Sequence, residues 1–229
     1  MKLLLTSNGL SNDSIAKAFI DLVGKDPKDT KVAFIPTAAN PERDDKSWLI
    51  DDLYRIKEQG LYVDIIELTA IKSTVLKKAL ENMDVIFVGG GNSFYLSYWM
   101  QKSGLFKLLP ELLKTKVYAG ISAGSMVAGA SLLESGALDH IDEFLDDHYY
   151  DRVIKGEASN KTPNLVDIVF RPHLNAPDFP KVREDLLKEV AKKLSLPMYA
   201  LDDESALKIV DGKVEVISEG KWLLLNGDK

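Results

Sequence analysis

Short apolar runs alternate with amphipathic segments along the first two thirds of the chain, and this alternation limits most strongly how the chain can fold. The apolar runs have the length and composition of buried strands, and they cover residues 2–7, 31–38, 62–68, 84–92 and 117–122. Between them, hydrophobic residues recur at helical spacing, in residues 11–24 and 45–59, in a short helix that Ser73 caps, in residues 93–102 and in a helix from Ala123. Strands joined by crossover helices pair in parallel, with both faces of their sheet covered. The sequence therefore predicts an α/β fold, a three-layer sandwich around a mostly parallel sheet.

The last third of the chain departs from this alternation. Residues 138–164 are polar, acidic and aromatic, without a clear period. A strand at residues 164–170 and a helix at Phe179–Leu194 are predicted after them. Short strands follow, and Asp211 and Gly212 have the composition of a two-residue hairpin turn. We therefore expect a C-terminal β-hairpin.

Two further features concern the continuity of the fold. Pro110 interrupts an apolar stretch, which predicts two short helical pieces there. No internal repeat, low-complexity segment or linker divides the chain. We therefore expect residues 1–229 to form a single domain.

The composition excludes several classes of function. The net charge is −6, and no run of Lys or Arg forms a basic stripe, so we expect neither nucleic acid nor a membrane surface as a partner. The chain has no cysteine, which excludes disulfides, thiolate metal sites and a cysteine nucleophile. The first apolar run is shorter than the roughly 7–15 residues of a secretory signal, and no run approaches the ~20 residues that span a bilayer. We expect a cytoplasmic protein.

The sequence Gly-Ile-Ser-Ala-Gly, residues 120–124, joins a predicted strand to a predicted helix. A nucleophile elbow lies at such a junction, because the tight turn lifts the serine hydroxyl off the sheet and small neighbours make room for it. The first amides of the helix face any negative charge that develops there. Ser122 is thus a candidate nucleophile. A structural turn of small residues is the alternative.

Three glycines, Gly89–Gly91, end the preceding strand and come to the same edge of a parallel sheet. Glycine lets the backbone approach a substrate and supply a second amide donor for an oxyanion, although turns and anion-binding loops also use glycine. The first strand–helix turn lacks Gly-x-Gly-x-x-Gly, and no Gly-Lys-Ser/Thr follows the glycines. These absences argue against a dinucleotide-binding site and a P-loop.

A serine nucleophile needs a base, and the chain has three histidines. His173 follows a predicted strand, after Pro172, so we expect it at the same edge as Ser122. His140 and His148 are alternatives in the acidic stretch, whose spacing matches no metal-ligand pattern, so we expect no metal and no cofactor. The carboxylate that orients the base is open between four residues, namely Asp203, Glu204, Asp139 and Asp142.

Four motifs, "GGGNSFYL", "GISAGS", "RPH" and "LDDESAL", occur in the order and spacing of a known family. In these motifs the chain resembles the peptidase E (aspartyl dipeptidase) family of serine peptidases, whose relatives include cyanophycinase. The resemblance covers essentially the whole chain and implies a fold similar to class I glutamine amidotransferases, which is flavodoxin- or Rossmann-like. It implies Ser122 as nucleophile, His173 as base and either Asp203 or Asp139 as the acid.

The same resemblance implies an oxyanion hole formed by the amides of Ala123 and of Gly90 or Gly91. We also expect Asn92 and Arg171 to contact the substrate. Members of the family usually have Asn-Pro-His where this chain has Arg171-Pro172-His173. Arg171, or Arg152, is a candidate to offset the acidic stretch when an aspartyl side chain binds.

These observations favour a serine hydrolase of small peptides, a dipeptidase acting on Asp-X or a related substrate. Two alternatives stay open: an esterase or isoaspartyl (cyanophycinase-like) peptidase that uses the same site, and an inactive member that binds a small metabolite. The exposed helical faces are compatible with a homodimer.

Overall fold

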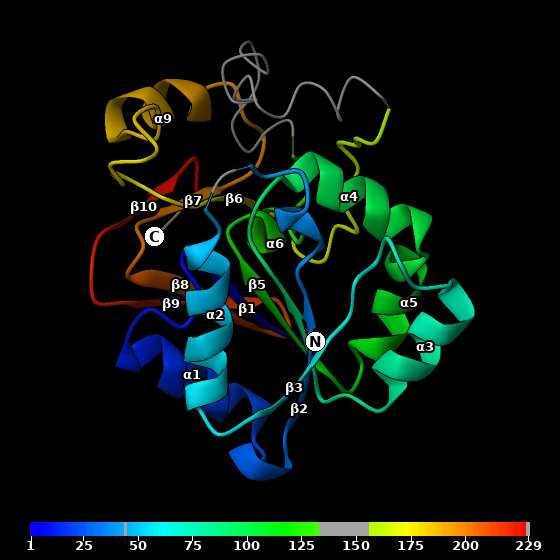
Figure 1. Cartoon of the computed structure of the whole chain (residues 1–229). Helices are drawn as coiled ribbons and strands as arrows, with labels where there is room; N and C mark the ends of the chain where they lie inside the picture. Colours follow the sequence, from blue (N-terminus) through cyan, green and yellow to red (C-terminus); the bar gives the residue numbers. More distant parts are fainter. Residues whose placement is uncertain (44, 133–155, 228–229) are drawn as a thin grey trace.

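The computed structural model describes residues 1–43, 45–132 and 156–227. A seven-stranded sheet with the order β3-β2-β4-β5-β1-β8-β9 lies at its centre (Figure 1). Five of these strands are parallel, and they are β1 (Lys2–Thr6), β2 (Lys31–Ile35), β3 (Tyr62–Ile65), β4 (Val85–Val88) and β5 (Val117–Ile121). The last two, β8 (Ser205–Val210) and β9 (Lys213–Ser218), are antiparallel to their neighbours. The predicted α/β fold with a mostly parallel sheet is confirmed.

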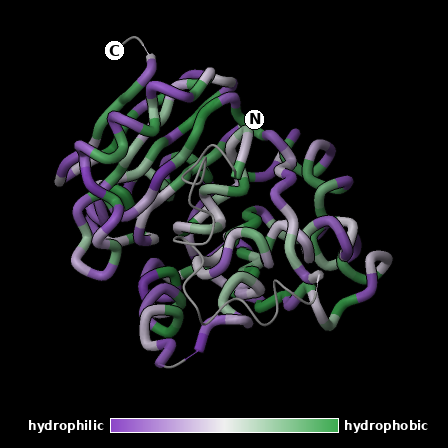
Figure 2. Tube along the Cα trace, turned by 90° about the horizontal axis from the view of Figure 1, so that it is seen from above, coloured by the Kyte–Doolittle hydropathy of each residue, from purple (hydrophilic) through white to green (hydrophobic). Residues whose placement is uncertain are grey.

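Helices cover both faces of this sheet. On one face, α1 (Asp13–Val23) and α2 (Ser47–Glu58) contribute to one hydrophobic cluster. The other face is covered by α3 (Ser73–Glu81), α4 (Ser93–Lys102), α5 (Leu105–Leu112) and α6 (Ala123–Met126). Two short 3-10 turns, η1 (Pro27–Asp29) and η2 (Thr37–Ala39), lie next to β2. Hydrophobic and hydrophilic stretches alternate along the helices, as expected of helices with one buried face (Figure 2).

The parallel strands are apolar because both of their faces are buried. In β1, Leu3 and Leu5 belong to the cluster on one face of the sheet, and Leu4 belongs to the cluster on the other. Each fully buried leucine stabilises the fold by roughly 1.5–3 kcal/mol relative to an exposed one. This burial explains why the strands read as continuous apolar runs rather than as an alternation of apolar and polar residues.

A second, three-stranded sheet lies beside the central one and was not predicted. Its order is β10-β7-β6, formed by β6 (Val169–Arg171), β7 (Met198–Leu201) and β10 (Trp222–Leu225). The helix α9 (Glu184–Ala191) packs against it and shares a third hydrophobic cluster with it. This sheet brings the residues that follow β6 and β7 to the carboxyl ends of the parallel strands (Figure 1).

The C-terminal hairpin is present as predicted, with Asp211 and Gly212 joining β8 to β9. Both residues have positive φ, 50° and 84°, which is the backbone of a type I′ turn. The structure also places Ser73 as the first residue of α3 rather than as its cap, which is Lys72.

The prediction of two helical pieces around Pro110 is wrong, because α5 runs through it as one helix. Leu105, Leu109 and Leu112 of α5 are buried together in the core. Pro110 lies on the exposed side of the helix, where water can bond the carbonyl that its ring leaves without a partner. The burial of the leucines therefore outweighs one missing hydrogen bond.

Two predicted boundaries in the last third are also wrong. The strand expected at residues 164–170 is limited to β6, because the amide of Leu165 bonds Ala128 and that of Ile168 closes a turn onto Val166. The helix expected at Phe179–Leu194 begins only at Glu184.

No helix within residues 1–43, 45–132 and 156–227 combines the length and the apolar character that a membrane span requires.

The carboxyl group of Asp52, in the middle of α2, is buried against the loop after β1. Asp52 is 4% exposed, and a Cβ at Gly9 would lie 2.9 Å from its Oδ1. Burial raises the pKa of Asp52 to about 7; Arg55, 4.0 Å away, opposes this rise, and Asp51 adds to it. Between these two pKa values, Asp52 therefore keeps its proton in the folded protein and releases it in the unfolded chain, where its pKa is the ordinary 3.8.

We predict that Asp52 makes the protein less stable as the pH rises from about 4 to about 7, since only the unfolded chain ionises freely in this range. Asp52→Asn removes the effect and increases the free energy of unfolding at pH 8 by about 2–4 kcal/mol. Urea unfolding of both proteins between pH 4 and pH 8 measures it. The matched control is Asp51→Asn, because Asp51 is the exposed neighbour. Parallel stability curves for Asp52→Asn and the parent would contradict the prediction.

Candidate active site

Ser122 lies at the sharp turn between β5 and α6, with φ 46° and ψ −106°. This backbone conformation is strained for a residue with a side chain, and such strain is found mainly at functional sites. The turn is packed so closely that a Cβ at Gly124 would lie 2.1 Å from the carbonyl oxygen of Val88, and one at Gly120 2.6 Å from the amide nitrogen of Ser125. The small residues around the serine are therefore required by the close approach of α6 to the ends of β4 and β5.

Three hydrogen bonds to backbone carbonyls hold this turn. The hydroxyl of the buried Tyr118 donates to the carbonyl of Gly124 at 2.6 Å. The hydroxyl of Ser125 donates to the carbonyl of Thr6 at 2.8 Å, while the amide of Ser122 donates to the same carbonyl at 3.0 Å. The turn is thus fixed to β1 as well as to β5.

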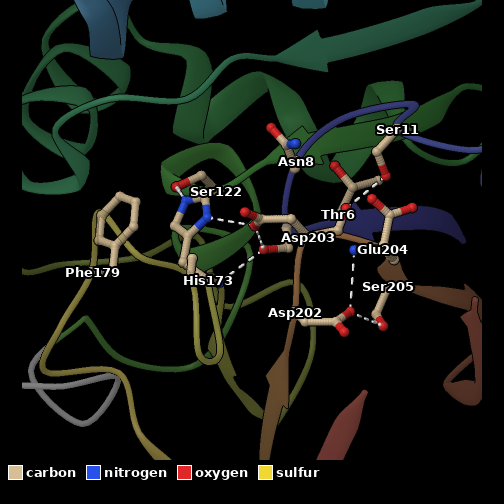
Figure 3. A network of polar contacts seen from close by, with 12 residues as sticks. Thr6, Asn8, Ser11, Ser122, His173, Phe179, Asp202, Asp203, Glu204 and Ser205 are labelled. Atoms are coloured by element: carbon tan, nitrogen blue, oxygen red, sulfur yellow. Dashed lines mark hydrogen bonds and ion pairs between the residues drawn. The ribbon is translucent and has the colours of Figure 1, made fainter. Parts of the chain in front are cut away.

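His173 comes to this turn from β6, 51 residues further along the chain. Its Nε2 lies 2.9 Å from the Oγ of Ser122, and Figure 3 shows its ring between Ser122 and Asp203. The backbone of His173 has φ 64°, and its side chain is only 12% exposed. The predicted proximity of Ser122 and His173 is therefore present in the structure.

Asp203 lies on the other side of the same ring, in the turn between β7 and β8. Its Oδ1 is 2.7 Å from Nδ1 of His173. Burial by itself raises the pKa of Asp203, but the hydrogen bond and charge of His173, the hydrogen bond of Ser7 and the charge of Arg55 lower it below its ordinary value. An ionised carboxylate only accepts hydrogen bonds, so Nδ1 carries the proton and Nε2 is left to accept the proton of the serine hydroxyl.

Of the four carboxylates that the sequence left open, the structure brings Asp203 to His173. The side chain of Glu204 accepts from Nδ2 of Asn12 at 3.0 Å and is exposed. Asp139 and Asp142 lie outside the described residues, as do His140, His148 and Arg152. In the part of the chain that the structure describes, no group of three or more His, Asp or Glu is placed to hold a metal ion.

Ser7 is a member of this cluster that the sequence did not predict. Its hydroxyl donates to Oδ1 of Asp203 at 2.8 Å and accepts from the backbone amide of His173 at 2.8 Å. Ser7 directly follows β1 and is completely buried. One hydroxyl therefore connects the carboxylate to the backbone of the histidine. The parallel register pairs Thr6 with Ile121, so Ser7 leaves the sheet beside Ser122, and this pairing of distant segments has no signal in the sequence.

The backbone amides near Ser122 are available for an oxyanion. Among the hydrogen bonds of the described residues, none uses the amides of Gly90, Gly91 or Ala123. A Cβ at Gly90 would lie 3.5 Å from that of Ser122, so its backbone passes directly beside the serine. Gly91 has φ 125°, and a Cβ there would lie 2.3 Å from the carbonyl oxygen of Ala38. Only glycine fits at that position.

Asn92 and Arg171 are the two residues expected to contact the substrate, and in the structure the first caps a helix and the second is buried. Oδ1 of Asn92 accepts from the amide of Tyr95 at 2.9 Å and caps α4. Arg171 ends β6, and its side chain is buried, which lowers the pKa of Arg171 to about 10 and leaves it protonated at neutral pH. Substrate contact by either residue stays a prediction.

The fold and site define an α/β protein with a Ser–His–Asp arrangement at the carboxyl edge of its sheet, and comparison with known proteins supports this class. Residues 3–217 match the model of peptidase family S51. Peptidase E of Streptomyces coelicolor is 26% identical over 239 residues, covering 100% of this chain and 82% of its own. An uncharacterised peptidase of Pasteurella multocida is 24% identical over 202 residues, covering 87% of this chain and 89% of its own.

A solved structure described as a proposed peptidase E protein, from Listeria monocytogenes, has the same fold. It aligns with a TM-score of 0.76 at 22% sequence identity and covers 96% of this chain and 98% of its own. The chain belongs to peptidase family S51, and it is a serine-type peptidase.

We predict that Ser7→Ala lowers kcat/KM about tenfold to a hundredfold with little change in KM, because it removes one hydrogen bond from Asp203 and leaves the amide of His173 unsatisfied. Ser205→Ala is the matched control. Ser205 is equally buried, but its hydroxyl bonds Asp202 and Ser218 instead (Figure 3). Steady-state kinetics of the parent and of both variants measure kcat and KM and test the prediction. Equal effects of the two substitutions would show that Ser7 contributes only to stability.

Proposed function

We propose that this peptidase is a dipeptidase that hydrolyses small peptides, Asp-X dipeptides or related substrates, through Ser122. One observation carries the proposal: the continuous path of contacts from Oγ of Ser122 through both nitrogens of His173 to Asp203, at 2.9 and 2.7 Å. Each of the two distances is within hydrogen-bond range. This is the arrangement that activates a serine for acyl transfer.

In the proposed reaction, Ser122 attacks the scissile carbonyl while Nε2 of His173 takes the hydroxyl proton. The same nitrogen then returns the proton to the leaving amine, and a peptide C–N bond is exchanged for an ester to the serine. Water attacks this acyl-enzyme with His173 again as the base, which releases the acid product and restores the serine. Asp203 holds the imidazole in the required tautomer and stabilises its charged form.

The negative charge of the tetrahedral intermediate needs donors that are in place before the reaction starts. We assign this role to the amide of Ala123 together with that of Gly90 or Gly91. The support for this assignment is that these amides lie beside the serine and are not used by other described residues. Loss of one donor from an oxyanion hole costs ~3–4 kcal/mol of barrier in comparable enzymes.

The choice of small peptides as substrates is supported by the relatives of this chain and by its sequence motifs. The relative from Streptomyces coelicolor is named peptidase E, and the sequence motifs of this chain resemble those of aspartyl dipeptidases. β-Aspartyl dipeptides and simple esters are the alternative substrates, and both require the same serine chemistry. A substrate comparison therefore distinguishes the specificity without changing the mechanism.

The proposal is tested by measuring turnover of Asp-X dipeptides, other α-dipeptides, β-aspartyl dipeptides and p-nitrophenyl esters. We expect cleavage of Asp-X or related dipeptides, and we expect Ser122→Ala and His173→Ala each to lower kcat at least about a thousandfold with the fold unchanged by circular dichroism. Ser73→Ala, at an exposed serine of α3, serves as the control. Turnover that survives in Ser122→Ala would refute the proposed nucleophile. Preference for esters or β-aspartyl substrates would instead refute the Asp-X specificity.

A further inference from the structure

An exposed phenylalanine lies flat against the imidazole of His173. The ring centroids of His173 and Phe179 are 4.1 Å apart, and their planes differ by 4°. Figure 3 shows the two rings side by side, with Phe179 on the side of His173 that is opposite to Asp203. Phe179 is nevertheless 42% exposed, so burial of its own side chain does not explain its position.

Phe179 is held in place by the backbone of its loop. The amide of Ala176 bonds the carbonyl of His173 at 3.1 Å, and that of Phe179 bonds the carbonyl of Ala176 at 3.1 Å. The amide of Val182 then bonds the carbonyl of Phe179 at 3.0 Å. These consecutive turns return the chain to the histidine, and none of them uses the phenyl ring.

Arg183 reinforces the same loop from its far end. Its guanidinium donates to the carbonyls of Ala176, Phe179 and Val182, at 3.2, 2.8 and 3.0 Å from Nη1. These bonds explain why α9 begins after Arg183 and not at Phe179. The loop therefore has its own supports and presents the ring to His173.

We propose that Phe179 is a positioning residue for the general base: its ring covers one face of the His173 imidazole and favours the charged form that arises when Ser122 gives up its proton. The inference rests on the proposed function, in which His173 carries this proton. A flat contact restricts rotation of the imidazole, so that Nδ1 stays directed at Asp203 and Nε2 at Ser122. The face of an aromatic ring also attracts a cation placed over it, and this attraction arises only after the proton has moved.

Because the attraction to a charged imidazole exists in the transition state and not in the resting enzyme, its loss lowers kcat rather than raising KM. We expect Phe179→Leu to lower kcat and kcat/KM by about three- to tenfold, with KM unchanged within about twofold. Phe179→Tyr keeps an aromatic face and restores most of the activity. The backbone hydrogen bonds of the loop remain in both variants, and the exposed position tolerates both side chains.

Leu186→Ala is the matched control, because Leu186 is a large apolar residue of similar exposure, 49%, in the helix α9 that follows the loop of Phe179. Its kinetics should equal those of the parent. Unchanged kcat in Phe179→Leu, or equal losses in the Leu and Tyr variants, would overturn the inference. A rise in KM alone would also overturn it, since the ring would then contact the substrate instead of positioning the base.

A second readout does not depend on turnover. The ring protons of His173, assigned by comparison with His173→Ala, should resonate upfield in the parent and in Phe179→Tyr, and should lose this shift in Phe179→Leu. The absence of an upfield shift in the parent would overturn the inference, and this result does not depend on which substrate the enzyme hydrolyses. A parent that shows the shift but hydrolyses no dipeptide would refute the proposed function and leave the stacking role supported by its spectrum.

Discussion

The hydrogen bonds on the two ring nitrogens of His173 are the interaction on which the rest of the site depends. Nε2 faces the hydroxyl of Ser122, and Nδ1 faces the carboxylate of Asp203. The three side chains come from different strand ends, so the contact requires that two sheets deliver them to one point. The central sheet supplies the serine after β5. The second sheet supplies the histidine after β6 and the aspartate after β7.

The second sheet explains why the histidine and the aspartate meet. Strands β6 and β7 pair in parallel with Arg171 opposite Ala200, so the residues that follow both strands leave the sheet at the same edge. The amide of Leu174 bonds the carbonyl of Leu201 at 2.9 Å and continues the pairing to the histidine itself. The hydroxyl of Ser7 then ties this edge to β1 of the central sheet. The geometry of the site is thus a consequence of strand pairing, and the buried hydroxyl of Ser7 connects the two sheets at this point.

The parts of the structure that the sequence predicts are those determined by local pattern. Both faces of the parallel strands are buried, and this burial produces apolar runs that can be recognised in the sequence. Ser122 lies between a strand and a helix, which places it at the carboxyl edge of the sheet. Ser7 and Phe179 escape such reasoning because their roles depend on pairing between segments far apart in the chain. The start of α9 at Glu184 escapes it for the same reason, since the three carbonyls bonded by Arg183 outweigh the helical spacing of the apolar residues before it. Pro110 is the opposite case. The local rule that proline ends a helix fails there, because the burial of three leucines of α5 stabilises the helix by more than the missing hydrogen bond costs.

The central claim is that Ser122, activated by His173, attacks a carbonyl whose oxygen is received by backbone amides. The most direct test is a crystal structure of the protein after reaction with a fluorophosphonate. Our account predicts a phosphonyl group bonded to Oγ of Ser122, with one oxygen within hydrogen-bond distance of the amides of Ala123 and of Gly90 or Gly91, and with the His173 ring still between Ser122 and Asp203. A folded protein that does not react, or an adduct on another side chain, would contradict it.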